Sequence, residues 1–236
     1  MGEGPPLTSK ETLYSWMVSG YQPERFIKNL ISIDGKLNIP FSSDVGGEGN
    51  FSLAEHTLRV LAQFDKYFAD KDLPGGIDKN FLRFVLAVHD IGKPEAIRRG
   101  KKGDQHFYTL KIIVPLMESL RFNADEIRLA KALIEDDTIS SYLQVCATGE
   151  AIPDQTLKRL LASFFRRVRG LSVDPSSFFA LKLIYFQSDA GSYNKDAGGK
   201  KDRIDLFIFD PKNGEMRLSP IAGQRIKELK GTLGVE

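Results

Sequence analysis

The chain has 236 residues, of which 42% are hydrophobic and 27% are charged, so it has enough apolar side chains to bury a core. This composition excludes a mainly disordered chain and a collagen-like or low-complexity one. Lysine and arginine number 33 against 31 aspartate and glutamate, and the net charge of +2 argues against a dedicated nucleic-acid coat protein while allowing a local phosphate site.

The N-terminal residues 1–9 are rich in glycine and proline and contain no apolar run of the kind that a secretory signal needs. No apolar stretch elsewhere approaches the roughly 20 residues of a membrane-spanning helix. We therefore expect a cytoplasmic protein that does not enter a membrane. The single cysteine, Cys146, excludes an intrachain disulfide and a cysteine-rich zinc site.

Helical patterns dominate the first half of the chain. Apolar spacing predicts helix within 10–35, and a glycine-bearing stretch predicts a loop over 36–50. Ser52 and Glu55 form an S-x-x-E capping box, which predicts the start of a helix that carries His56 on an apolar face. A further apolar helix is predicted over 81–91. It should end at Gly92, because glycine suits the end of a helix and the proline at 94 cannot continue it.

The second half continues mainly as helix. Residues 98–105 form a predicted basic loop, and helical patterning resumes near Leu110, with Pro115 at a kink or in a first turn. Only the late segments 204–209 and 215–218, which flank the turn sequence DPKNG, are typical of strands. The sequence therefore predicts an all-α fold with a small C-terminal β-hairpin. Further amphipathic helices are predicted over 127–134, 157–168 and 175–190.

The pair His89-Asp90 is the sharpest chemical signal in the sequence. It leaves an apolar helix just before a Gly-Lys-Pro break, where both side chains can turn toward one centre. Imidazole and carboxylate together suit Zn, Mn, Fe, Co or Ni better than Ca. Other helices would have to supply more ligands. His56 lies on an apolar face, and Asp189 ends an apolar run in which a carboxylate needs a partner or a metal.

The order of these residues resembles a known family. AEHTLRVL around His56, AVHDIGKP around His89-Asp90 and the late acid Asp189 resemble the H…HD…D pattern of the HD-domain metal-dependent phosphohydrolases. The string HDIGKP is most similar to HD domains attached to tRNA nucleotidyltransferases and to cyclic-dinucleotide phosphodiesterases. The resemblance covers 50–195, as an HD-type helical core. Residues 1–49 are then a partly helical N-terminal extension, and 196–236 a C-terminal extension with the hairpin, expected to pack on the same domain.

The resemblance implies an HD-domain helical bundle with one divalent metal ion, which is Mn, Mg, Co, Ni, Fe or Zn, held by His56, His89, Asp90 and Asp189. The reaction it implies is hydrolysis of a phosphoester in a nucleotide or related small substrate, by water that the metal activates. Lys93 matches the family's lysine after the dyad and would contact phosphate. Asp90 and Lys93 are thus the expected catalytic residues.

A basic loop follows the dyad directly. Its side chains are candidates for holding a further phosphate or a polynucleotide backbone, although such loops are usually solvated surface. His106 is a candidate lining residue of the same phosphate pocket. An RNA partner is therefore possible but is the weaker alternative. The basic candidates are Arg98, Arg99, Lys101 and Lys102.

Two departures from the family pattern favour a single metal. Members with two metals carry F-x-G-H after the dyad and a later L-I-x-x-H, and here Thr109 and Asp137 stand where the two histidines would be. A catalytically weak, HD-like nucleotide- or RNA-binding module is the alternative that this departure leaves open, and a structural His89-Asp90 helix cap is the simplest one. Asp189 has three possible replacements as the last ligand: Asp65, Asp136 and Asp196.

Overall fold

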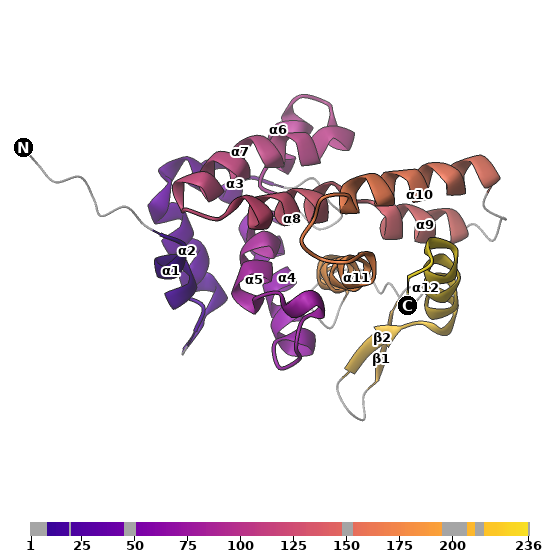
Figure 1. Ribbon diagram of the computed structural model, residues 1–236. Helices are drawn as coiled ribbons and strands as arrows, with labels where there is room; N and C mark the ends of the chain where they lie inside the picture. Colours follow the sequence, from indigo (N-terminus) through magenta and orange to yellow (C-terminus); the bar gives the residue numbers. More distant parts are fainter. Residues whose placement is uncertain are drawn as a thin grey trace, which may run out of the picture. The chain divides into compact units, whose positions relative to one another are not determined.

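The structure is a computed structural model in which helices contain most of the described residues, with one short antiparallel hairpin (Figure 1). The predicted all-α fold with a small β element is therefore confirmed. Among the residues that the structure describes, no helix is long and apolar enough to cross a membrane. The described residues are 9–18, 20–44, 51–147, 153–194, 207–210 and 215–235.

The chain divides into two compact units. The first unit comprises Met1–Leu61 and Asp78–Lys131, and the second comprises Ala62–Ile77 and Ala132–Glu236. The division expected from the sequence, with a core over 50–195 and two extensions, stays a prediction.

The first unit is built around buried aromatic side chains. Phe84 on α5 stacks on Phe122, with ring centroids 5.0 Å apart, and Leu13, Phe26 and Leu30 are fully buried. Its helices are α1 (Lys10–Ser15), α2 (Pro23–Ile33), η1 (Gly35–Leu37), α3 (Asn38–Ser42), the first half of α4 (Leu53–Phe68), α5 (Lys79–Val88), α6 (Lys93–Arg98), η3 (Lys102–Asp104), α7 (Gln105–Ser119) and most of α8 (Ala124–Glu135).

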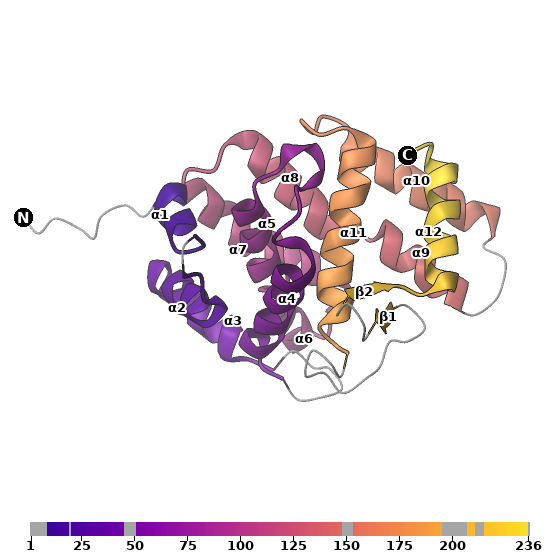
Figure 2. The same cartoon turned by 90° about the horizontal axis from the view of Figure 1, so that it is seen from below.

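The start of α4 shows the predicted capping box. The backbone N–H of Ser52 donates to the Glu55 carboxylate at 2.8 Å, and the Glu55 N–H donates to the Ser52 hydroxyl at 3.2 Å. These bonds lower the pKa of Glu55, first through the Ser52 backbone N–H and then through its hydroxyl. The reciprocal cap fixes where α4 begins. It therefore fixes the height of His56 on the helix, which runs beside α5 in both views (Figures 1 and 2).

The second unit has its own aromatic core. Phe164 on α10 contacts Phe178 and Phe179 on α11, with centroid separations of 5.7 and 6.2 Å. Phe165, the next residue along, is 46% exposed, so only one member of that phenylalanine pair belongs to the core. The elements are η2 (Pro74–Gly76), α9 (Thr138–Ala147), α10 (Asp154–Val168), α11 (Pro175–Gly191), β1 (Phe207–Asp210), β2 (Glu215–Leu218) and α12 (Pro220–Leu233).

The hairpin pairs β1 with β2 in antiparallel register, from Phe207 opposite Leu218 to Asp210 opposite Glu215. The predicted hairpin is therefore present, while residues 211–214 of its turn lie outside the described residues. The helix α12 follows directly, capped by the Ser219 hydroxyl at its start and by Gly234 in the left-handed conformation at its end.

Several local predictions were wrong. Residues 35–42 form η1 and α3 instead of a loop. Pro94 does not simply stop α5; it lies in the first turn of α6, where its missing N–H costs nothing. The predicted basic loop over 98–105 is partly helical, and α7 begins at Gln105, before Leu110, with Pro115 inside it. The helices α9 and α12 were not predicted.

Candidate metal centre

The dyad lies in the turn that follows α5, and the lysine is the first residue of α6. His89 caps the end of α5, the Ile91 N–H donates to the Val88 carbonyl, and the Lys93 N–H donates to the Asp90 carbonyl at 2.8 Å. His89, Asp90 and Lys93 are all buried, with 3%, 5% and 8% of their surfaces exposed. A helix end followed at once by a new helix therefore brings three polar side chains into one buried region of the first unit.

Gly92 lies against α7 at a distance that no other residue would allow. A Cβ atom at this position would lie 2.1 Å from the backbone nitrogen of Thr109. The Gly92 N–H donates to the Thr109 hydroxyl at 3.1 Å, and Thr109 is fully buried. The threonine that stands where the two-metal pattern has a histidine thus holds the backbone of the dyad turn.

His89 has a defined tautomer. Its Nδ1 lies 2.7 Å from the Leu86 carbonyl oxygen, which can only accept a hydrogen bond, so Nδ1 carries the proton. In the neutral ring, the lone pair then lies on Nε2, which lies 3.8 Å from Asp90 Oδ2. A backbone carbonyl that orients a histidine in this way is a common outer partner of metal-binding imidazoles.

His56 joins His89 from α4. It is 1% exposed, and the two imidazole rings have centroids 5.4 Å apart. Its Nε2 lies 3.5 Å from Asp90 Oδ2. Val60 and Phe64, on the same helix, are fully buried, so His56 extends an apolar face as the sequence indicated.

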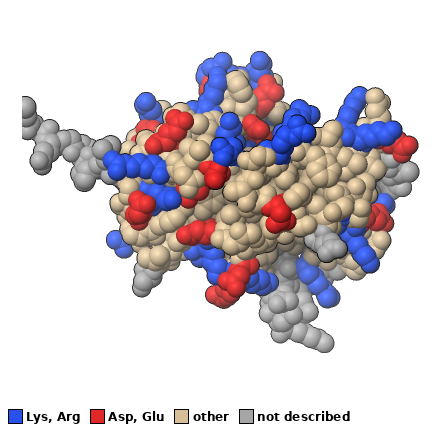
Figure 3. Space-filling view, in the orientation of Figure 1, with Lys and Arg blue, Asp and Glu red and all other residues tan. Residues whose placement is uncertain are grey.

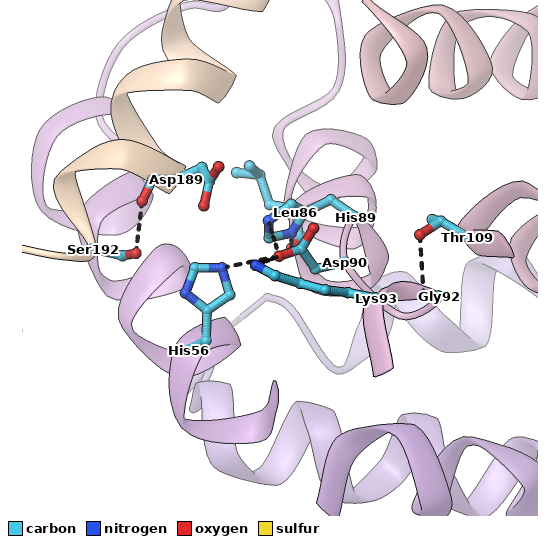
Figure 4. A network of polar contacts seen from close by, with 9 residues as sticks. All are labelled: His56, Leu86, His89, Asp90, Gly92, Lys93, Thr109, Asp189 and Ser192. Carbon is cyan, nitrogen blue, oxygen red and sulfur yellow. Dashed lines mark hydrogen bonds and ion pairs between the residues drawn. The ribbon is translucent and has the colours of Figure 1, made fainter. Parts of the chain in front are cut away.

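Three cationic or potentially cationic groups converge on one oxygen of Asp90. Lys93 Nζ donates to Asp90 Oδ2 at 2.7 Å, and the two imidazole Nε2 atoms lie 3.5 and 3.8 Å from it (Figure 4). The ammonium is the closest of the three. The predicted ligands His56, His89 and Asp90 are therefore brought together, with the predicted phosphate ligand Lys93 among them.

Asp189 lies in the last turn of α11. Its backbone carbonyl accepts a hydrogen bond from the Ser192 hydroxyl at 2.6 Å. One ring nitrogen of His56, one of His89 and one carboxylate oxygen of Asp189 lie within 4.8 Å of one another, so this group can hold a metal ion. Nitrogen and oxygen donors of this kind suit first-row transition metals.

The alternative acids differ in their surroundings. Asp136 is fully buried, and its Oδ1 accepts a hydrogen bond from the Thr138 hydroxyl at 2.7 Å. Asp137, which stands at the position of the second histidine in the two-metal pattern, is exposed. Asp65 is half-buried on α4, and Asp196 lies outside the described residues. Among the described residues, the group that could hold a metal ion includes neither Asp65 nor Asp136 nor Asp137.

The basic candidates lie on the surface. The side chains of Arg98 and Arg99 are 70% and 54% exposed, and both bind Glu95. These bonds, from Arg99 first and then Arg98, lower the pKa of Glu95. Lys and Arg gather over α6 at the top of the view in Figure 3. Lys101 and Lys102 are exposed, and His106 is half-buried in the first turn of α7. A phosphate role for these five residues stays a prediction.

Sequence reasoning missed the outer partners of the dyad. Leu86 contributes through its backbone carbonyl, and no residue pattern reveals such a role. Thr109 was noticed only as a replaced histidine, although a glycine at 92 within the turn signals close backbone packing.

Comparisons of the chain with models of protein families, with curated proteins and with solved structures found no match.

Proposed function

We propose that this protein is an HD-type, metal-dependent phosphohydrolase that hydrolyses a phosphoester of a nucleotide or of a related small phosphorylated substrate. The observation that carries the proposal is the group of His56, His89 and Asp189, whose donor atoms lie within 4.8 Å of one another. The dyad residue Asp90 adds a carboxylate 3.5 and 3.8 Å from the two imidazoles. The H…HD…D resemblance names the same four residues.

The side chains present fit one divalent metal. Two imidazoles and two carboxylates supply a mixed nitrogen and oxygen donor set, which favours Mn, Fe, Co, Ni or Zn over the oxygen-preferring Mg. His89 is already held by Leu86 with Nε2 as the acceptor. A bound metal would lower the pKa of water and neutralise phosphoryl oxygens.

The remaining residues have roles that follow from their positions. Burial of His56, His89 and Asp90 keeps bulk water away from the donor atoms and strengthens electrostatic interactions there. The Lys93 ammonium, 2.7 Å from Asp90, is a buried positive charge beside the site that would bind a phosphate oxygen. The Thr109–Gly92 bond keeps the turn in place.

The proposal is tested by elemental analysis and by a screen of phosphomonoesters and phosphodiesters. We expect about one divalent metal per chain and turnover that needs it. The variants His89→Ala and Asp90→Ala should lose both the bound metal and the turnover. Asp125→Ala, which removes an exposed carboxylate from α8, is the matched control and should keep both. Metal content and turnover that survive in both site variants would overturn the proposal.

A nucleotide-binding module without turnover is the second candidate. It is favoured by Thr109, which is engaged with the Gly92 N–H, and by the exposed Asp137, because neither position offers the histidine of the two-metal pattern. A nucleotide that raises the melting temperature but remains intact with Mn, Mg, Co and Ni would support this candidate. Steady product formation would eliminate it.

A further inference from the structure

Lys93 has a contact that its role as a phosphate ligand does not explain. Its side chain is 10% exposed, and its Nζ lies 2.7 Å from Asp90 Oδ2, whose own side chain is 6% exposed. A buried ammonium and a buried carboxylate at this distance form a charge-assisted hydrogen bond. Asp90 is therefore already neutralised from within the chain.

The oxygen that Lys93 binds is the one that faces both imidazoles. Nε2 of His56 lies 3.5 Å and Nε2 of His89 lies 3.8 Å from the same Oδ2. A metal ion held by these two nitrogens would reach Asp90 through this oxygen. A divalent cation and an ammonium at one carboxylate oxygen repel each other, and burial weakens the screening of that repulsion.

We propose that Lys93 competes with the metal for Asp90, so that metal binding releases the ammonium toward the substrate phosphate. This inference rests on the metal site of the proposed function and adds its regulation. Lys93 stabilises the metal-free protein and weakens metal binding. By linkage, metal and a phosphate-like anion then favour each other's binding, because the released ammonium is available only in the metal-loaded protein.

The chain allows the ammonium to move without moving the turn. The backbone at Lys93 is held by its own N–H bond to the Asp90 carbonyl at 2.8 Å, and Gly92 is held by Thr109. The flexible four-carbon stem of lysine can therefore redirect the ammonium while the dyad keeps its place.

The test is a calorimetric titration of metal-free protein with Mn²⁺, in chloride buffer without phosphate. We expect Lys93→Gln and Lys93→Met to bind Mn²⁺ about tenfold more tightly than the wild type. Both variants should also melt at a lower temperature than the wild type when no metal is present. Lys131→Gln removes an exposed lysine charge from the first unit and is the matched control, with unchanged affinity.

The outcomes separate this inference from the proposed function. If wild type and variants all fail to bind Mn²⁺ and the other divalent metals, the proposed function is wrong. If the wild type binds but the Lys93 variants bind equally or more weakly, the competition is wrong and the metal site stands. Replacing chloride by sulfate at equal ionic strength should tighten Mn²⁺ binding more in the wild type than in Lys93→Gln, and an equal gain would overturn the release of the ammonium.

Discussion

Two buried lysines, one in each unit, have their ammonium groups stabilised by different partners. Lys93 in the first unit and Lys182 in the second are 8% and 5% exposed. Lys93 binds the carboxylate of Asp90, whereas Lys182 donates to the Leu133 backbone carbonyl at 2.6 Å and lies 4.0 Å from the Tyr185 ring. The first lysine has a full countercharge at hydrogen-bond distance, and the second is held by a peptide dipole and an aromatic face.

These different partners correspond to different roles: Lys182 supports the fold, whereas Lys93 belongs to the proposed metal site. Leu133 lies in the last turn of α8, where carbonyls have no partner within the helix, so Lys182 caps that helix end. Burial lowers the pKa of Lys182, against the opposing effects of the Asp136, Asp137 and Asp189 carboxylates. Lys93, in contrast, competes for a carboxylate that other groups can use.

The largest expected effect concerns the backbone that carries Lys93. Gly92→Ala would bring a methyl group to 2.1 Å from the Thr109 nitrogen, so α6 and α7 would have to separate. We expect a loss of about 4 kcal/mol in the free energy of unfolding, measured by urea denaturation. Gly103→Ala, whose added methyl meets nothing within 4 Å, is the control. Equal stability of the two variants would contradict the close packing.

The next largest effect on stability is expected when the ion pair between Lys93 and Asp90 is broken. Asp90→Ala leaves the Lys93 ammonium buried without its carboxylate, and we expect the metal-free protein to lose about 3 kcal/mol of stability. Denaturation in a chelating buffer measures this loss. The double variant with Lys93→Met should recover part of it, because no buried charge is left. If the double variant loses the sum of both single losses, the two side chains do not act as a pair.

Local signals in the sequence were sufficient to predict several elements of the fold. Ser52 and Glu55 define the start of α4 and hence the position of His56, and both bonds of the predicted cap are present. The hairpin was predicted from its turn residues. The start and end of α12 had equally local signals in Ser219 and Gly234, so this helix could have been predicted.

Contacts between distant residues could not be predicted in this way. Thr109 meets Gly92 across 17 residues, and Lys182 meets Leu133 across 49. Packing of one helix on another creates both contacts, and the residue pattern of either helix alone is silent about them. Lys182 was not singled out because a lysine within the apolar helix α11 is typical of a surface position.

The contribution of Lys182 to the free energy of unfolding should depend on pH. Because burial lowers the pKa of Lys182 below 10.5, the unfolded chain binds more protons than the folded one as pH approaches 10.5 from below. The stability of the wild type relative to Lys182→Met should therefore rise as pH rises through this window. Urea denaturation of both proteins at several pH values between about 7 and 10 measures the difference. A constant or falling difference would mean that Lys182 is not desolvated.

The smallest effect on stability is expected at Arg98, which is exposed, unlike the buried Lys93 and Lys182. Arg98 binds Glu95 with its side chain 70% exposed, so water and salt screen the pair, and Arg98→Gln should shift the melting temperature by no more than about 1 °C. If Arg98 holds a substrate phosphate, the same variant should raise KM about two- to fivefold at low salt, and less at high salt because screening weakens the wild-type contact. Steady-state kinetics at two salt concentrations checks this once a substrate is found. A clear fall in melting temperature would show instead that Arg98 supports the fold, as Lys182 does, although it is exposed.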